Sequence, residues 1–404
     1  MFAMNLRPSI LLAAAAMLSV QAADVFPTCR FHYGTDQSFV DPTSKTSIPG
    51  LLAQVDYVTG PWTGQSSTFD LSGYYTFCKN NNKVPVNQCY AIAFAARRDQ
   101  GLQDCNVSNS SNLCTGGANY IRQNQSKILG IYASYGAGVY KIMGSSPSVW
   151  LMEPDFTQYT LTSQAGGGLT NAEAGTLMKA IVSTIKAACP SAVFSMDISP
   201  WYDTTWQRKW YTALGLDQFT YINTSGGQSR GDQTDISNTE TGAPTWYWVY
   251  HSLGKPVFAD AGYGTGGAGT GYDARWDVLS NATARIKDGV IGIAQENPGS
   301  NWASIVSGLR PQLPAPPSCS KTGIIAASPS PEPYNGAAIV GRTLRVDGEG
   351  SFQVSLRDFQ GRAVFSRTFQ GPASIPLTAP EGLYAAQVVS GGHLVLSAGF
   401  ASVK

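Results

Sequence analysis

The sequence predicts an α/β fold, a closed (β/α) barrel of the TIM type followed by a small all-β sandwich. Residues 24–310 alternate short apolar runs with longer helix-like segments, and about eight such units are typical of a closed barrel. The interval 311–336 is rich in Pro, Ser and Ala, which is typical of a semi-rigid linker. Residues 337–404 change to a period-two alternation with Gly-bearing turns, which indicates antiparallel strands.

Residues 1–23 predict a cleaved secretory signal. Arg7 supplies a positive charge, Ile10–Val20 forms an apolar core, and Val20-Gln21-Ala22 offers small residues where a signal peptidase cuts. The core is too short to span a bilayer, and a buried N-terminal helix is the alternative. We therefore expect the mature chain outside the cell, either secreted or held at the cell surface.

The apolar runs of the barrel region are expected to be strands buried on both faces, with amphipathic helices between them. No Gly-rich phosphate loop follows the first strand, so an open doubly wound sheet is the less favoured alternative. The predicted strands are 30–35, 54–59, 89–96, 149–153, 192–198, 218–223, 256–261 and 290–295. The predicted helices are 117–143, 171–188, 204–214, 243–253, 273–288 and 301–309.

The tail, residues 337–404, carries two motifs. Leu356–Arg362 reads L-x-D-x-x-G-R and Gly382–Val388 reads G-L-Y-x-x-x-V. Both resemble C-terminal sorting domains of certain gliding or fibre-degrading bacteria, and the resemblance implies contact with secretion machinery or attachment to the cell surface. A carbohydrate-binding module is the alternative, but the tail has no Trp and, besides Tyr384, only a few Phe for stacking on sugars.

Seven cysteines follow the predicted signal, so two or three disulfides and at least one free thiol are expected in an oxidising compartment. Cys105 and Cys114 are close enough in sequence to close one loop, and they are the first predicted pair. This spacing is not C-x-x-C and the chain has only three histidines, which argues against a zinc site. No metal and no organic cofactor is expected.

The composition bounds the partners of the chain. The formal net charge is +1 and 13% of residues are charged, which argues against nucleic acid or an anionic membrane as a partner. Gly, Ser, Thr, Asn, Tyr and Trp are frequent. Such a surface suits a neutral, hydroxyl-rich ligand, because aromatic rings stack on sugar faces while amides bond hydroxyl groups. We expect a polysaccharide substrate and a monomeric chain.

Carboxylates follow five of the eight predicted strands, in a chain that is otherwise poor in charge. Any one of them is equally well explained as the N-cap of the next helix. Together they would meet at the C-terminal face of a barrel, where catalytic groups lie. Crowded carboxylates shift one another's pKa, and glycosidic cleavage needs one protonated acid and one carboxylate. The acids at the strand ends are Asp99, Asp104, Glu153, Asp155, Asp197, Asp260 and Glu296.

Nucleophilic Ser-His-Asp catalysis is poorly supported. His251 lies inside a predicted helix, away from the strand ends. An esterase is therefore disfavoured.

The segment Trp150–Asp155 (WLMEPD) resembles the E-P-D strand end of glycoside hydrolase family 6, cellulases with a distorted parallel barrel. The resemblance implies that Asp155 is the general acid and that Glu153 helps to organise the site. Arg98-Asp99 is similar to the R-D motif of that family, whose Asp supports the acid, and Asp104-Cys105 is a rival match.

The resemblance continues downstream and covers about residues 85–300. Asp197 with Trp201 resembles the D-A-G segment and the sugar-stacking Trp of the family, and Val257–Gly267 places Asp260 at the Asp of D-T-x-x-N-G. The K-P-x-G-E-x-D-G motif that carries the proposed base of the family is not recognisable, and Glu296 is the candidate nearby.

Two mechanisms follow from these carboxylates. In an inverting mechanism Asp155 is the acid, Asp260 or Glu296 positions the water, and Asp99 tunes Asp155. In a retaining mechanism Glu153 is the acid/base and Glu296 the nucleophile. A carboxyl separation of about 6.5–9.5 Å favours inversion and one of about 5–5.5 Å favours retention.

Aromatic residues near the strand ends are candidates for sugar binding, although ordinary packing explains each equally well. Trp62, in the loop Gly60–Gly64, and Trp201 are the strongest, followed by Tyr202 and Tyr263. A β-glucanase that acts on a cellulose-like polysaccharide is the first hypothesis. A non-catalytic carbohydrate-binding protein on a hydrolase-like barrel is the second.

Overall fold

The computed structural model describes residues 25–320 and 337–402 with short internal gaps. The chain divides into two compact units, Met1–Lys321 and Thr322–Lys404. Residues 311–320, expected to begin the linker, thus belong with the barrel unit. The predicted signal and residues 321–336 of the predicted linker lie outside the described residues. The gaps are 27–28, 108–110, 200, 225–228, 237–241, 262–270, 341–342, 359–362, 377–381 and 391–392.

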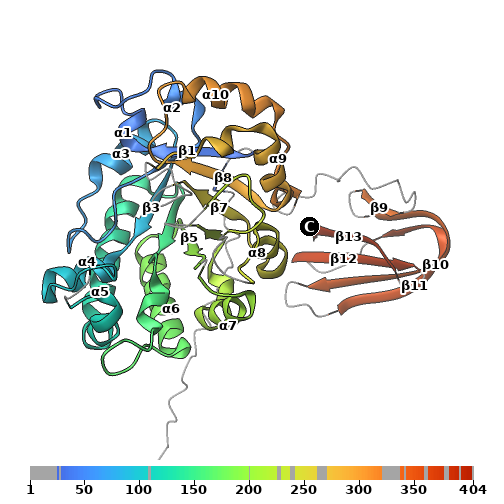
Figure 1. The fold of residues 1–404 in the computed structure, drawn as a ribbon. Coiled ribbons are helices and arrows are strands. Elements are labelled where there is room, and N and C mark those ends of the chain that lie inside the picture. Colours follow the sequence, from blue (N-terminus) through green and yellow to red (C-terminus); the bar gives the residue numbers. More distant parts are fainter. Residues whose placement is uncertain are drawn as a thin grey trace, which may run out of the picture. The chain divides into compact units, whose positions relative to one another are not determined.

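Eight parallel strands form a closed barrel in sequence order, which confirms the predicted fold (Figure 1). Each strand pairs with the next, and the first pairs with the last to close the ring, with His32 opposite Gly292. The strands are β1 (His32–Asp36), β2 (Tyr57–Thr59), β3 (Val84–Cys89), β4 (Ser148–Met152), β5 (Ala192–Asp197), β6 (Tyr221–Asn223), β7 (Val257–Asp260) and β8 (Val290–Gln295).

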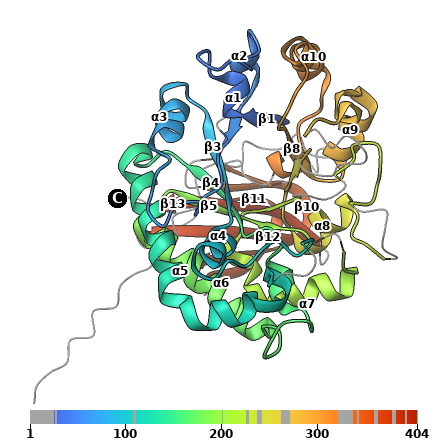
Figure 2. The ribbon, with the colours of Figure 1, turned by 60° about the vertical axis from the view of Figure 1, so that its left-hand side comes forward.

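Helices connect these strands on the outside of the barrel. They are α1 (Gln37–Val40), α2 (Leu51–Gln54), α3 (Ser72–Asn80), α4 (Ala91–Gln100), α5 (Leu113–Met143), α6 (Asn171–Ala188), α7 (Thr204–Leu214), α8 (Trp246–Leu253), α9 (Leu279–Lys287) and α10 (Trp302–Leu309). Short 3₁₀ helices are η1 (Phe156–Thr160), η2 (Leu216–Gln218), η3 (Ala274–Asp277), η4 (Arg310–Gln312) and η5 (Pro317–Ser320). Helices α4, α5, α6 and α7 follow one another around the barrel (Figure 2).

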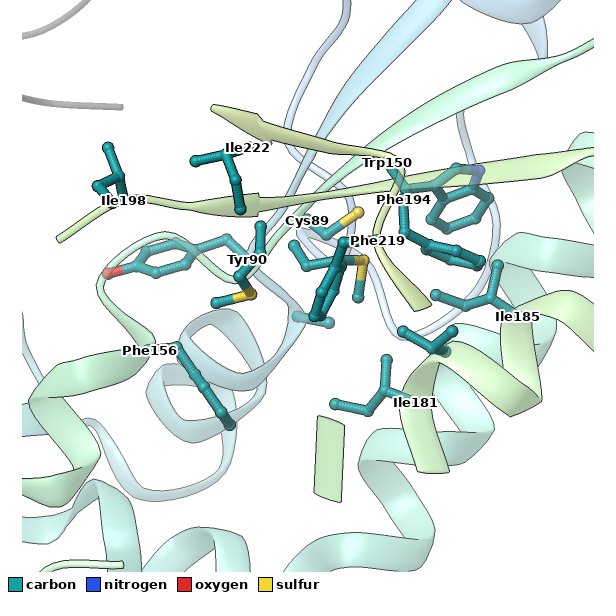
Figure 3. Packing of buried hydrophobic residues seen from close by; sticks show 14 of the residues in the cluster. Cys89, Tyr90, Trp150, Phe156, Ile181, Ile185, Phe194, Ile198, Phe219 and Ile222 are labelled. Atoms are coloured by element: carbon teal, nitrogen blue, oxygen red, sulfur yellow. The ribbon is translucent and has the colours of Figure 1, made fainter. Parts of the chain in front are cut away.

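Side chains alternate between the inside and the outside of the barrel along each strand, as parallel strands dictate. On β4, Val149 and Leu151 lie in the apolar cluster that fills the barrel. Trp150 lies in the cluster between the strands and the helices, and Figure 3 shows it beside Phe194 and Ile185 of α6. Fully burying one such side chain contributes about 2–3 kcal/mol, so this layer fixes the helices against the barrel.

The third predicted strand, 89–96, is wrong. The strand β3 covers Val84–Cys89, and the run that follows is the buried helix α4. An apolar segment buried on all sides has no periodicity that separates strand from helix, and the alanines of this run favour a helix. Pro85 argued against the true strand, but it precedes Val86–Cys89, the residues where β3 pairs with β4.

Two disulfides are present, and the predicted pair Cys105–Cys114 is one of them. The other, Cys29–Cys319, joins the segment before β1 to the segment after α10. The thiols of Cys78, Cys89 and Cys189 are free and buried, which confirms the expected surplus of thiols. None of the described helices is long and apolar enough to cross a membrane.

The second unit is all-β, as predicted, although its described strands hydrogen-bond as one antiparallel sheet and not as the two sheets of the expected sandwich. The order is β11-β10-β12-β13, with β9 also paired to β10. Leu344, Phe352, Val354 and Leu356 of β10 have the same parity and are buried in its core. The alternation predicted from the sequence therefore matches the residues of β10 that face this core. The strands are β9 (Ala337–Val340), β10 (Thr343–Asp358), β11 (Ala363–Pro376), β12 (Gly382–Ser390) and β13 (His393–Ser402).

Candidate active site

The alternation along three strands places Gln88, Asp260 and Glu296 together at the C-terminal end of the barrel. Val86, Phe258 and Ala294 point into the barrel, and each of the three polar residues follows two positions later, Gln88 on β3, Asp260 on β7 and Glu296 just after the end of β8. The rows of inward-facing side chains thus end in one amide and two carboxyl groups. In (β/α) barrels this end holds the active site.

The Gln88 amide joins the two acids. Its Nε2 donates to Asp260 Oδ2 at 3.3 Å and to Glu296 Oε1 at 2.9 Å. Gln88 and Asp260 are only 6% and 5% exposed, whereas Glu296 is partly exposed. Burial raises the pKa of Glu296, the Gln88 bond lowers it in part, and the negative charge of Asp36 raises it again. Glu296 is therefore poised to hold or release a proton at a higher pH than an ordinary glutamate.

Asp155 follows β4, the strand that pairs with β3. Its backbone is left-handed, with φ 62°, and the residue reaches solvent although protein surrounds most of its carboxyl group. Burial and the negative charge of Asp104 raise the pKa of Asp155, while the Tyr90 hydroxyl lowers it in part. A carboxyl group whose pKa is raised and which reaches solvent is suited to act as a general acid.

Glu153 lies behind Asp155, fully buried, with φ 39°. Its Oε1 accepts hydrogen bonds from the Ile92 backbone N–H and from the Tyr132 hydroxyl. Burial raises the pKa of Glu153 to about 8, although these two bonds lower it in part. Because Ile92 is in the first turn of α4, Glu153 ties the end of β4 to the start of that helix and to α5.

The backbone of E-P-D is strained. Among the described residues that are not glycine, only Asn82, Glu153 and Asp155 have positive φ. Such conformations cost roughly 1–3 kcal/mol each and are concentrated at functional sites. Here the strain turns Glu153 into the protein and Asp155 toward solvent.

The strand-end position predicted for Asp99 is wrong. The error comes from the misplaced third strand, because Asp99 is near the C-terminal end of α4 and not at a strand end. Its carboxylate accepts from Lys127 and Tyr120 of α5. Asp104, the rival match, acts on Asp155 instead, and the adjacent disulfide Cys105–Cys114 closes the loop that carries it.

Asp197 ends β5 as predicted and is only 7% exposed. The Asn223 side chain donates to it at 3.4 Å, and the Tyr211 hydroxyl donates to its backbone carbonyl at 2.6 Å. These contacts tie the ends of β5 and β6 to α7. Asn223 and Asp260 also line a small cavity inside the barrel.

Two of the predicted aromatic residues reach solvent. Trp201, after β5, is 48% exposed. Trp62 is partly exposed, and its ring lies 5.4 Å from that of Tyr90, between centroids. Arg98 holds the Trp62 loop by donating to the carbonyls of Gly64 and Gln65. The partly exposed Trp62 thus lies against Tyr90, whose hydroxyl acts on Asp155, and the exposed Trp201 follows the end of β5.

The other predicted aromatic residues differ. Tyr202 stacks on Trp206 of α7 with ring centroids 3.8 Å apart, which gives one face of the tyrosine a packing role. Tyr263 lies outside the described residues. Within the described part of the chain, no group of three or more His, Cys, Asp or Glu side chains is arranged to hold a metal ion.

Sequence reasoning missed Asp36, Gln88 and Tyr90. Asp36 ends β1, so the rule that found the other acids applies to it as well. Gln88 and Tyr90 were hidden by the misplaced third strand, since Gln88 is an inward residue of β3 and Tyr90 follows its last residue. A reading of VPVNQC as the strand would have found both.

Comparison with known proteins leaves the family open. No family model matches the chain, and no curated protein matches it in sequence. An endo-β-1,4-mannanase of glycoside hydrolase family 26 from Cellulomonas fimi is 12% identical over 92% of this chain and 93% of its own, with a TM-score of 0.46. A family 26 β-mannanase from Bacteroides ovatus is 10% identical over 71% of this chain and 91% of its own, with a TM-score of 0.47. The endoglucanase Cel6 from Mycobacterium tuberculosis is 17% identical over 63% and 78%, with a TM-score of 0.35.

Proposed function

We propose that this protein is a secreted glycoside hydrolase that cleaves a β-glucan of the cellulose type with inversion. One observation carries the proposal: the C-terminal end of the barrel holds three carboxyl groups in two different settings. Asp155 is a solvent-exposed acid of raised pKa, and Asp260 with Glu296 forms a pair joined by Gln88. Hydrolysis of a glycosidic bond needs such a division between a proton donor and a group that activates water.

In this mechanism Asp155 donates its proton to the glycosidic oxygen as the bond to the anomeric carbon breaks. A water molecule attacks that carbon from the opposite face of the ring, and its proton passes to the Asp260–Glu296 pair. Asp104 contributes by raising the pKa of Asp155. Each acid–base contribution is typically worth about 10²–10⁴ in rate.

The retaining alternative, with Glu153 as acid/base, is less well supported. Glu153 is 0% exposed and its Oε1 is engaged by Ile92 and Tyr132. A substrate could reach it only if α4 and α5 moved. We assign Glu153 to holding the E-P-D turn, the organising role that the resemblance to family 6 implies.

The substrate class rests on the aromatic residues and on that resemblance. Trp201 and Trp62 offer exposed ring faces, and the chain as a whole carries little net charge, which suits a neutral polysaccharide. Asp197, buried beside Asn223, holds the strand end that leads to Trp201. Two disulfides support an oxidising, extracellular compartment, and the sheet of the tail supports a separate sorting or attachment domain.

The test is to express the chain with its leader, recover it outside the cell, and incubate it with β-1,4-, β-1,3- and mixed-linkage glucans, mannan and xylan. We expect new reducing ends from a β-glucan, α-configured products in early proton NMR spectra, and a loss of at least about 100-fold in Asp155→Asn. β-Configured early products would instead favour the retaining mechanism.

The second candidate is a non-catalytic carbohydrate-binding protein, which the exposed Trp201 favours. It predicts that one polysaccharide retains the protein in a pull-down while none is cleaved. In that case Trp201→Ala should abolish retention, and Asp155→Asn should leave it unchanged.

A further inference from the structure

The contacts of Gln88 carry an inference that rests on the proposed hydrolysis and deepens it. A carboxylate can only accept hydrogen bonds, so the side-chain nitrogen of Gln88 is the atom that faces both acids. That nitrogen has two hydrogens, and the two contacts to Asp260 and Glu296 use both of them. One buried amide is therefore committed entirely to these two carboxyl groups.

The geometry limits how far apart the two acids can lie. Their oxygens Oδ2 and Oε1 are 3.3 and 2.9 Å from the same nitrogen, so they cannot be much more than about 6 Å from each other. Two negative charges at this distance in a largely buried site repel each other, so the two carboxyl groups are expected to titrate in two coupled steps. The two acids differ in exposure, because Asp260 is buried and Glu296 reaches the barrel mouth.

The groups around the pair come from four strands. Asp36 at the end of β1 acts on Glu296 through its negative charge. The Tyr57 hydroxyl of β2 is buried and feels the charge of Asp260. Gln88 of β3 is neutral, and the Thr224 hydroxyl after β6 accepts from the Asp260 backbone N–H at 3.1 Å.

The chain just after β3 also carries a residue that acts on Asp155. Tyr90 follows two residues after Gln88, and its hydroxyl acts on Asp155. One short stretch of backbone therefore sets the position of both carboxyl groups that the reaction needs. This is the arrangement that a fixed distance between acid and base requires.

We infer that Gln88 is a positioning residue that holds Asp260 and Glu296 as one coupled pair, and that this pair takes the proton of the attacking water through Glu296. In that step a water O–H bond breaks and its proton joins a Glu296 oxygen. The water oxygen bonds to the anomeric carbon, the glycosidic bond breaks, and the leaving oxygen takes the proton of Asp155. Asp260 stays buried and ionised, so the pair carries one negative charge after the transfer.

Two variants should move the pair in opposite directions. Gln88→Met removes both donors at similar length and burial, so the ionised pair is less stabilised and the acid limb of the kcat/KM profile should rise by about 1 pH unit. Asp36→Asn removes the nearby negative charge while Asn still caps α1, so the limb should move to lower pH. At neutral pH, Gln88→Met should lower kcat about 10- to 100-fold with little change in KM.

The matched control is Gln164→Met, the same change in an equally buried glutamine that bonds the Ala118 N–H and the Leu113 carbonyl. It should cost stability and leave the acid limb where it is. The inference is overturned if Gln88→Met and Asp36→Asn leave the limb unmoved or shift it the same way. If Gln88→Met does not fold, Asp36→Asn still tests the pair: an acid limb moved to lower pH supports it, and an unmoved limb contradicts it.

A second readout does not depend on hydrolysis. In protein with carbon-13 in its carboxyl groups, the Glu296 signal is identified by its absence in Glu296→Gln and followed by NMR as the pH is changed. We expect a two-step titration that Gln88→Met moves up and Asp36→Asn moves down. A single step at an ordinary glutamate pKa would reject the pair, whereas a two-step titration without glycan cleavage would reject only the proposed function.

Discussion

The two ends of the barrel treat carboxylates in opposite ways. At the N-terminal end, Asp56 accepts from Arg30 at 2.5 Å and from Arg310 at 3.1 Å. Burial alone would raise the pKa of Asp56, but His32 and the two arginines hold it well below its usual range. At the C-terminal end, burial raises the pKa values of Asp155 and Glu296, and neighbouring carboxylates raise them further.

The difference follows from which partners each end supplies. Arg310 follows α10 and Arg30 precedes β1. Asp56 therefore ties the beginning of the barrel unit to its end, as the disulfide Cys29–Cys319 also does. The acids at the mouth meet hydroxyls, amides and other acids. The acid at the N-terminal end is thus held ionised by cations, whereas the acids at the C-terminal end have raised pKa values. This difference agrees with the general division between a stabilising and a functional face in such barrels.

The largest expected effect is at the N-terminal end. Asp56→Asn leaves two arginines beside a neutral amide, and loss of one partner of a buried ion pair costs about 3–5 kcal/mol. Because the folded pKa of Asp56 is lowered, its contribution is present above the unfolded pKa of about 3.9 and is lost as the pH falls below it. Urea unfolding at pH 7 and at pH 3 should show a large difference from wild type that shrinks at the lower pH.

The control for this prediction is Asp232→Asn. Asp232 also pairs with an arginine, Arg230, at 2.9 Å, but its side chain is 34% exposed. An exposed pair is worth about 0–1 kcal/mol, so this variant should unfold almost as wild type does. Equal losses of unfolding free energy in both variants would mean that the ion pairs of Asp56 stabilise the fold no more than an exposed pair does.

A smaller effect is expected from Glu153→Gln. Burial raises the pKa of Glu153 from 4.5 to about 8, so folding favours its protonated form. The stability that this preference gives is complete below the unfolded pKa and is lost as the pH rises toward the folded one, on the order of 1.4 kcal/mol per pH unit. Gln still accepts from Ile92 and Tyr132, so the variant should match wild type near pH 4 and gain on it toward pH 8 in thermal unfolding.

Glu173→Gln provides the matched control, since Glu173 is bonded to Arg122 on the surface of α6 and its pKa is lowered. That variant should show no relative gain between pH 4 and pH 8. A Glu153→Gln curve parallel to wild type would mean that Glu153 is ionised when folded, and would reopen it as a catalytic group.

The barrel could be predicted because its signals are local. Apolar runs at β4, β5 and β8 are bounded by turn residues, and α6 begins with the capping box Thr170 and Glu173. The same rules failed at β3, where a polar strand with a proline precedes an apolar helix. In that case burial in the finished fold, and not local pattern, decides which segment becomes the strand.

The residues of the site could be predicted only where an acidic residue lies at the end of a strand. Asp155, Asp260 and Glu296 each lie at or just after the end of a strand, so the parallel topology places them at the mouth. Gln88 pairs the two acids through side-chain contacts across the barrel, and Asp99 is bonded instead to Lys127 of α5. No sequence pattern encodes these contacts. Short motifs located the acids, but not their partners.

The smallest expected effect distinguishes Asp104 from Asp99 as the neighbour of the acid. Asp104 is 49% exposed and paired with Arg97, so its negative charge on Asp155 is partly screened. Asp104→Asn should lower the pKa of Asp155 and move the alkaline limb of the kcat/KM profile down by about half a pH unit. Asp99→Asn, which disturbs only the contacts to Lys127 and Tyr120, should leave that limb in place. A shift in Asp99→Asn alone would favour the R-D match of the resemblance over the geometry, and would move the tuning of the acid from the disulfide loop to the end of α4.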